Sequence, residues 1–263
     1  MLNAESAFGS LWKNAFCLML TYRKLGIQRR MDSATVLSID TEPSRVRVTK
    51  SILSCPEYMA ITRLYSRVRT KLANLTLPAG LRSGMYLIPV ALAAEVDTII
   101  ANAEEELRQL VDVFLAQYDT RIAEEAARLK AAYRTSDYPD PDTVRAAFGL
   151  TYSYITFDLP GTLETISATM LKREERRSME KVNNMLEDVN TYLREAMRSL
   201  VNHLVDRLSP SDTGKSKTFK SSTLTNLLEF LNTFEARNLG NDVELAQLVS
   251  SAKNVLSGVN SQL

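Results

Sequence analysis

Two long segments of the chain carry apolar residues at helical spacing. In the first, the steps between apolar residues are four, three, four, four, three, four and four: Leu92, Val96, Ile99, Ala103, Leu107, Leu110, Phe114 and Tyr118. In the second, the same steps connect Val182, Leu186, Val189, Leu193, Met197, Leu200, Leu204 and Leu208. Neither segment contains an interior Gly or Pro, and this spacing keeps the apolar residues on one helix face. We therefore predict long helices over about 90–133 and 162–208.

These two helices determine the predicted fold. Each carries one apolar stripe that must be buried, and the other helix is the nearest partner, so we expect an elongated, mainly α protein built on an antiparallel helical hairpin. Between them, Asp140-Pro141 is typical of a helix start, and Tyr152 and Tyr154 alternate with polar positions as in a strand. The pattern predicts a small α/β cap at the hairpin tip.

Shorter elements are predicted on both sides. A capping box from Ser54 to Glu57 predicts a helix that ends near Leu75. Four of its residues are expected to face the protein interior: Ile61, Leu64, Val68 and Leu72. Two C-terminal helices are expected at about 222–236 and 242–257. Their inward stripes are Leu224, Leu227, Leu231 and Phe234, then Leu245, Leu248, Ala252 and Val255, with Asn241 and Glu244 capping the second helix.

The N-terminal pattern gives three further expectations. Helical spacing predicts a packed amphipathic helix through Phe8, Leu11, Trp12, Ala15, Phe16 and Met19. A short hairpin is expected within 34–50, and the Pro and Gly residues of 76–89 indicate a tight loop. The predicted domain division is a basic N-terminal region (1–80), the helical hairpin (81–208) with its inserted cap (134–161), and a C-terminal helical pair (209–263).

Composition narrows the class of protein. Among 263 residues, 45% are apolar and 24% charged, the net charge is +1, and there are one His and two Cys. A zinc site of several Cys and His is thereby excluded, and Cys17 and Cys55 are expected to be buried free thiols. No apolar run approaches the roughly 20 residues that span a bilayer. We expect no membrane association and a location inside the cell.

The charge is unevenly distributed. Residues 1–80 hold 12 Lys and Arg against five Asp and Glu. One helix face there carries Arg63, Arg67 and Lys71, with Tyr65 and Arg69 beside it, and such a stripe can neutralise phosphates and stack a base. The alternatives are a solvated face, or a surface that meets the acidic segment at 104–106.

Motifs for chemistry are weak. Gly214-Lys215-Ser216 imitates the end of a phosphate-binding loop but lacks its first Gly and its preceding strand. The acids Asp137, Asp140 and Asp142 fit helix capping better than cation binding, because prolines lie between them. His203 is the only histidine, so no second imidazole is present to share a metal ion with it. We therefore expect no enzyme, no catalytic or metal-binding residue and no cofactor.

Three stretches carry a family resemblance: Leu77-Pro78-Ala79-Gly80 with 84–89, Asp137-Tyr138-Pro139, and 219–242, which ends in Ala-Arg-Asn-Leu-Gly-Asn-Asp. On these the chain resembles a family of phage and prophage proteins known only as a domain of unknown function, over most of 40–260. Such proteins are often encoded near MoxR-type AAA+ ATPases. The resemblance implies phage infection as the setting, with a location in the cytoplasm of the bacterial host and a partner such as an AAA+ ATPase, and it transfers no site residue.

Several functions remain open on this evidence. The first hypothesis is a non-catalytic interaction protein, a helical scaffold or adaptor that forms a homo-oligomer or binds a phage or host protein. The alternative is nucleic-acid binding in phage replication or recombination, through Arg63, Tyr65, Arg67, Arg69 and Lys71. A lower alternative is an inhibitor of a host defence complex, and a pore-forming hairpin ranks last.

Overall fold

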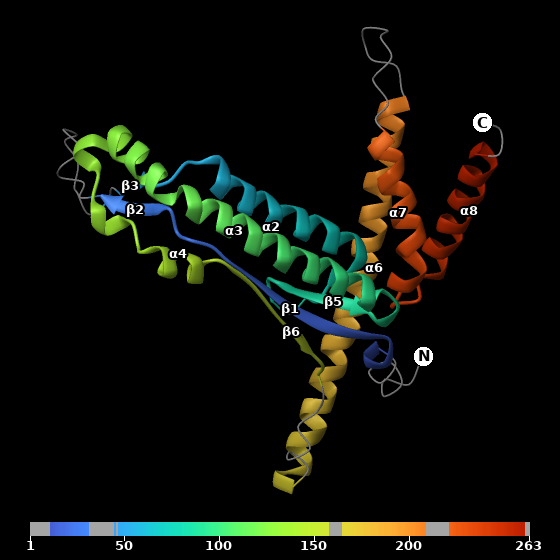
Figure 1. Ribbon diagram of the computed structural model, residues 1–263. Coiled ribbons are helices and arrows are strands. Elements are labelled where there is room, and N and C mark those ends of the chain that lie inside the picture. Colours follow the sequence, from blue (N-terminus) through green and yellow to red (C-terminus); the bar gives the residue numbers. More distant parts are fainter. Residues whose placement is uncertain are drawn as a thin grey trace. The chain divides into compact units, whose positions relative to one another are not determined.

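The computed structural model describes residues 11–31, 45, 47–80, 82–157, 165–208 and 221–260 (Figure 1). These residues are mostly helical. The main helices are α2 (Pro56–Leu75), α3 (Ala93–Leu129), α4 (Pro141–Ala147), α6 (Ala168–Leu208), α7 (Ser221–Arg237) and α8 (Val243–Asn260). Short 3-10 turns are η3 (Val90–Leu92), η4 (Lys130–Ala132) and η5 (Thr135–Asp137). The strands are β1 (Ala15–Arg23), β2 (Gln28–Met31), β3 (Val48–Ser51), β4 (Leu77–Pro78), β5 (Met85–Pro89) and β6 (Gly149–Ile155).

The chain folds into two compact units that are interleaved in sequence. The first unit combines Met1–Leu20, Lys71–Asp97 and Tyr152–Leu263, and the second combines Thr21–Thr70 and Thr98–Thr151. Among the described residues, no helix is both long and apolar enough to cross a lipid bilayer.

The first unit is built on an antiparallel sheet whose strand order is β4-β5-β1-β6. Cys17 of β1 lies opposite Leu87 of β5, which also faces Leu77 of β4. Gly84 has a φ of +81° where β5 begins, and its carbonyl accepts a hydrogen bond from the Leu20 amide at 2.9 Å. The core of this unit joins the sheet to α6, α7 and α8 through Leu11, Ala15, Cys17, Leu77, Leu87, Val182, Met185, Val189, Leu193, Leu227, Phe230, Leu231, Phe234, Leu245 and Val249.

The second unit contains most of α2 and α3, together with α4 and the antiparallel pair β2 and β3. Its core is rich in aromatic residues. The ring of Phe114 lies 6.3 Å from that of Tyr58 and 5.7 Å from that of Phe148 in edge-on contacts. The Tyr58 hydroxyl donates to the Leu25 carbonyl at 2.8 Å, so this polar group is satisfied inside the core.

Several predicted elements are confirmed. The two long helices occur as α3 and α6, and α2, α4, β6, α7 and α8 follow the expected ranges. The four residues predicted to face inward on α2 are all buried, as are Leu227, Leu231 and Phe234 of α7. The antiparallel pairing of the two long helices stays a prediction, because α6 belongs to the first unit and most of α3 to the second. The three-part domain division also stays a prediction.

Other expectations need correction. The fold is mainly helical, as expected, but it also contains a four-stranded sheet that was not predicted, and β6 of the predicted cap is one of its strands. The predicted N-terminal helix is wrong: helical turns stop at residue 14, and Ala15–Arg23 is strand β1. The spacing of Leu11, Ala15 and Leu18 fits a helix, but pairing with β5 fixes the extended form. Similarly, the predicted loop at 76–89 holds β4 and β5.

Two smaller expectations also change. Asn241 does not cap α8: its φ of +51° is left-handed, and the Leu245 amide donates instead to Asp242 Oδ1 at 3.1 Å. The predicted hairpin at 34–50 falls largely outside the described residues, as do Phe8, residues 209–220 and the Gly214-Lys215-Ser216 motif. The part that is described, β3, pairs with β2 at 28–31.

Candidate interaction surfaces

The predicted basic face lies on α2. Arg63, Arg67, Arg69 and Lys71 are exposed, whereas Tyr65 is buried at 4% exposure. All five residues lie on α2. Lys71 belongs to the first unit, and the other four belong to the second. The four cations thus lie on the same helix, and nucleic-acid binding through them stays a prediction.

Tyr65 is held inside the second unit. Its hydroxyl donates to the Arg23 carbonyl at 2.7 Å and lies 3.3 Å from the Gly149 carbonyl, and its ring packs 5.2 Å from that of Tyr22. Burial raises the pKa of this phenol. Because the ring face and the hydroxyl are both engaged, Tyr65 cannot serve as a stacking platform for a base without a change in this core.

Two of the cations already have partners within the second unit. The Arg67 guanidinium lies 2.5 Å and 2.6 Å from the two carboxylate oxygens of Glu106 on α3. Arg69 lies 4.6 Å above the centroid of Tyr22, a cation–π contact. For Arg67, the face therefore meets the acidic segment, which was one of the two alternatives to nucleic-acid binding. The ion pair is exposed, so it contributes little to stability.

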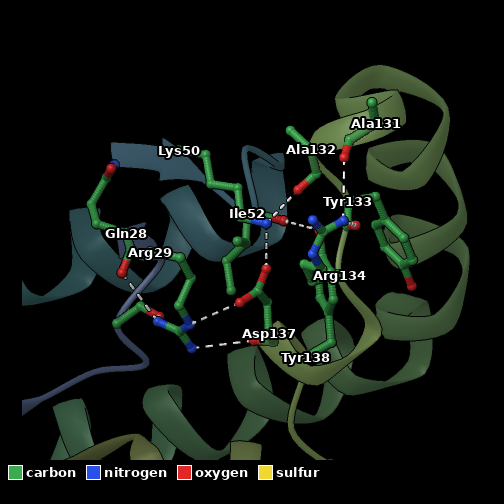
Figure 2. Close-up of polar contacts among 11 residues, drawn as sticks. Gln28, Arg29, Lys50, Ile52, Ala131, Ala132, Tyr133, Arg134, Asp137 and Tyr138 are labelled. Carbon is green, nitrogen blue, oxygen red and sulfur yellow. Dashed lines mark hydrogen bonds and ion pairs between the residues drawn. The ribbon is translucent and has the colours of Figure 1, made fainter. Parts of the chain in front are cut away.

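A second polar cluster joins the β2–β3 pair to the turns after α3 (Figure 2). The Lys50 ammonium lies 2.6 Å from Asp137 Oδ2 and also donates to the Ala132 carbonyl. Arg29 donates to the Asp137 carbonyl at 3.2 Å, and the Tyr138 hydroxyl donates to the Ile52 carbonyl at 2.9 Å. Lys50 is only 9% exposed, so its carboxylate partner compensates a buried charge. The contacts give this cluster a structural role.

The acids Asp137, Asp140 and Asp142 do not form a candidate metal site in the part of the chain that the structure describes. Asp140 caps α4: its Oδ1 accepts from the Asp142 amide at 3.1 Å and the Thr143 amide at 3.0 Å. The hydrogen bonds from Thr143 lower the pKa of Asp140, since they favour its charged form. Across the part of the chain that the structure describes, no group of three or more His, Cys, Asp and Glu could hold a metal ion. The capping interpretation is confirmed for Asp140.

Among the residues that the structure describes, the most deeply buried cation lies in the first unit, and it was not predicted. Arg237, the last residue of α7, is 2% exposed, and one guanidinium nitrogen donates weakly to the carbonyls of Ala73 and Thr76, at 3.4 Å and 3.3 Å. These carbonyls end α2, which has no basic residue of its own in its last turn. The rings of Tyr192 and Phe230 each lie 5.7 Å from the guanidinium. Burial lowers the pKa of Arg237. The side chain acts as a C-terminal cap supplied by another helix.

The turn between α7 and α8 is fixed by a second arginine. Arg194 of α6 places Nε 2.6 Å from Asp242 Oδ2, and a terminal nitrogen 2.8 Å from Glu244 Oε2. The Arg194 guanidinium holds the pKa of Asp242 below its usual range, because it stabilises the carboxylate. Arg194 therefore connects α6 to the end of 219–242, one of the stretches that carried the family resemblance. This gives Asp242 a structural role.

Exposed apolar side chains gather on two helices of the first unit. Val243, Leu248 and Val255 of α8 are 58%, 56% and 67% exposed. Val201 and Val205 of α6 are 38% and 55% exposed. The predicted inward stripe of α8 is therefore half wrong: Leu245 and Ala252 do pack on the core, whereas Leu248 and Val255 face outward. Apolar residues that repeat on an exposed helix face are typical of an interaction surface.

A groove of about 470 Å³ on α6 holds His203 together with Glu195, Ser199 and Asp206. Two further grooves lie elsewhere in the first unit. One, of about 760 Å³, runs along the α7–α8 turn and is lined by Lys13, Asn14, Glu235, Asn238 and Asn241 together with apolar residues. The other, of about 500 Å³, is lined mainly by the 76–86 segment and Tyr192. The described lining residues of neither of these two include an imidazole, a thiol or a pair of carboxylates. Neither of the two thus offers a recognisable acid–base or nucleophilic set.

Comparison with known proteins adds no relative: no protein-family model, no curated protein and no solved structure matches this chain. The candidate surfaces therefore rest on the geometry alone.

Proposed function

We propose that this protein is a non-catalytic interaction protein, a helical scaffold or adaptor that associates with itself or binds a protein partner. The observation that carries the proposal is the exposed apolar face of α8, where Leu248 and Val255 stand seven positions apart at 56% and 67% exposure. Two turns of the helix, about 10.5 Å, separate them, so they lie on the same side of α8. The antiparallel pairing of α3 with α6, and the elongated form that follows from it, belong to this proposal.

The polar side chains support the same proposal. Within the described ranges, each acidic group whose pKa is lowered has a structural partner: Asp140 caps α4, Asp242 is bound by Arg194, and Glu57 is bound by Arg121 at 2.6 Å. Groups tuned for catalysis are instead expected to converge in a cleft with unsatisfied or raised-pKa partners.

Nucleic-acid binding through the basic face of α2 is the alternative. The partners of Tyr65, Arg67 and Arg69 within the second unit weigh against it, since three of the five predicted contact residues are engaged. A gel-shift titration at low salt tests it, with Arg63→Glu combined with Arg67→Glu as the disabling variant. A salt-dependent shift that this variant abolishes would favour the alternative over the interaction protein.

The setting is part of the proposal and comes from the family resemblance. We infer that the protein acts in the cytoplasm of a phage-infected bacterium, with a phage or host protein such as an AAA+ ATPase as a partner. Inhibition of a host defence complex is a special case of this role, and rescue of phage growth in a defended strain would be its signature.

Affinity purification from infected cells tests the proposal directly. Samples with and without nuclease treatment are compared, and a protein that co-purifies equally in both supports a protein partner. A partner that is lost on nuclease treatment points to nucleic acid instead. A matched bait that carries Leu248→Glu shows whether the α8 face is needed for capture.

A further inference from the structure

We propose that the groove of about 500 Å³ in the first unit binds a small organic anion. The positive charge of Arg237 attracts the acidic group of this ligand from behind the groove wall, and Arg82 binds it at the rim. This inference goes beyond the proposed function, which requires no small-molecule site.

Arg237 is a buried charge that the protein neutralises only in part. Its side chain is 2% exposed, and among the described residues no carboxylate forms an ion pair with it. Its guanidinium contacts the carbonyls of Ala73 and Thr76 at the end of α2, at 3.4 Å and 3.3 Å. The C-terminus of a helix carries about half an elementary negative charge, so roughly half of the positive charge remains uncompensated. Because a buried charge is costly unless it is paired, an anion that binds nearby is stabilised.

The groove lies against this charge. Ala73 and Thr76, whose carbonyls the guanidinium contacts, both line the groove. Tyr192 lines it as well, and its ring lies 5.7 Å from the guanidinium. Arg237 is not itself a lining residue, so one layer of backbone and an aromatic ring separate it from a ligand. Across such a layer a charge is screened much less than in water, and its attraction for an anion persists.

The loop between β4 and β5 supplies a second cation. Gly80 and Gly84 have φ values of +65° and +81°, and between them Arg82 and Ser83 are exposed and line the groove. Within the described ranges, no carboxylate forms an ion pair with Arg82. Its guanidinium is therefore free to bind two oxygens of a carboxylate or a phosphate, and the Ser83 hydroxyl adds a donor.

The rest of the groove fits the apolar body of such an anion. Its remaining lining is mostly apolar or aromatic: Leu77, Pro78, Ala79, Met85 and Tyr86. Small-molecule sites have volumes of roughly 300–1,000 Å³ and combine apolar walls with a few polar groups, as this groove does. The chemistry therefore favours a carboxylate or a phosphate attached to an apolar group.

One carboxylate near the loop determines the orientation. A Cβ atom at Gly80 would lie 3.1 Å from Asp188 Oδ2, so this carboxylate closely approaches the backbone there. Like charges repel, and the acidic group of a ligand is therefore expected beside Thr76 and Tyr192 rather than beside Gly80.

A ligand titration followed by amide NMR tests the site in the full chain. The probes are benzoate and phenyl phosphate, with benzamide as a neutral molecule of the same shape as benzoate. At low salt, we expect at least one of the two anions to bind at least about tenfold tighter than benzamide and to shift the amide signals of Gly84 and Tyr86. The anion that binds tighter identifies whether the site prefers a carboxylate or a phosphate.

Variants at three charged residues separate charge from packing. Arg237→Gln and Arg82→Gln should each weaken binding of that anion at least about threefold, whereas Arg237→Lys, which keeps the charge, should retain most of it. Asp188→Asn should strengthen binding about twofold, because it removes the nearby repulsion. Arg198→Gln is the matched control, since Arg198 is an exposed arginine of α6 that does not line this groove.

Tighter binding of an anion that Arg237→Gln and Arg82→Gln both weaken would support the site. Equal binding of benzoate, phenyl phosphate and benzamide would overturn it, as would anion binding that none of the charge changes alters. If Arg237→Gln does not fold, Arg82→Gln and Asp188→Asn give the same two outcomes. None of these results depends on the exposed face of α8, so failure of the anion site leaves the interaction protein standing.

Discussion

Replacement of Arg237 tests whether a buried cation holds the first unit together. Its side chain is 2% exposed, and its contacts with the carbonyls of Ala73 and Thr76 are long, at 3.4 Å and 3.3 Å. Its Nε has no hydrogen-bond partner among the described residues. Two effects therefore oppose each other: the charge stabilises the end of α2, and its desolvation destabilises the fold.

The magnitudes decide which effect dominates. Arg237→Met keeps much of the volume but removes the donors and the charge. An unsatisfied buried carbonyl costs about 1–3 kcal/mol, and loss of a cation at a helix C-terminus about 0.3–2 kcal/mol. Relief of the buried charge and of the unpaired Nε offsets part of this, so we expect the free energy of unfolding to fall by about 1–2 kcal/mol. Arg237→Ala also opens a cavity, and we expect a fall of about 3–5 kcal/mol.

Urea denaturation measures both variants. The fluorescence of Trp12, the only tryptophan, reports on the first unit because its ring lies 5.4 Å from Phe157 at the edge of that core. Arg198→Met is the control, since Arg198 is an exposed arginine of α6 and its loss should change the free energy by less than about 0.5 kcal/mol. If Arg237→Met is as stable as the wild type, or more stable, the capping role assigned to Arg237 is wrong.

Three further predictions concern single contacts. Asp140→Ala should lower stability by about 1 kcal/mol through loss of the α4 cap, measured by urea denaturation, whereas Asp140→Asn should retain most of it. Arg121 lowers the pKa of Glu57, so this pair stabilises the fold above the ordinary pKa of Glu and loses its effect as the pH falls through the folded value. Thermal melts from roughly pH 5 to pH 3 should thus decline less for Glu57→Gln than for the wild type. Burial raises the pKa of Cys17 to about 11, so this thiol should react with a thiol reagent only as fast as the first unit opens; rapid labelling of folded protein would contradict its burial.

The helices could be predicted because their signals are local. The α2 stripe from Ile61 to Leu72 and the Asp140 cap with Pro141 depend on spacing and on backbone preferences within a few residues. Ala15–Arg23 shows the limit of this approach. Its apolar positions satisfy both helical and extended spacing, and only a partner strand seventy residues later in the chain, β5, decides between them. Short strands such as β4 exist only through such long-range pairing.

The candidate surfaces could be predicted in part. The sequence located the basic face of α2, but the pairing of Arg67 with Glu106 and the burial of Tyr65 depend on tertiary contacts. On α8, the spacing correctly placed Leu248 and Val255 on one apolar stripe. It did not indicate which edge of that stripe packs on the core and which edge stays exposed. The only local signal for Arg237 was its position in the Ala-Arg-Asn-Leu-Gly-Asn-Asp stretch. Nothing in the sequence indicates that its side chain contacts the end of α2.

The most direct test of the central claim is the molar mass of the full chain as a function of its concentration. Self-association through α8 predicts a rise from the 29.5 kDa of one chain towards twice that value, and the Leu248→Glu variant should remain at the mass of one chain. A wild-type protein that keeps the mass of a single chain at every concentration would contradict the claim that it associates with itself.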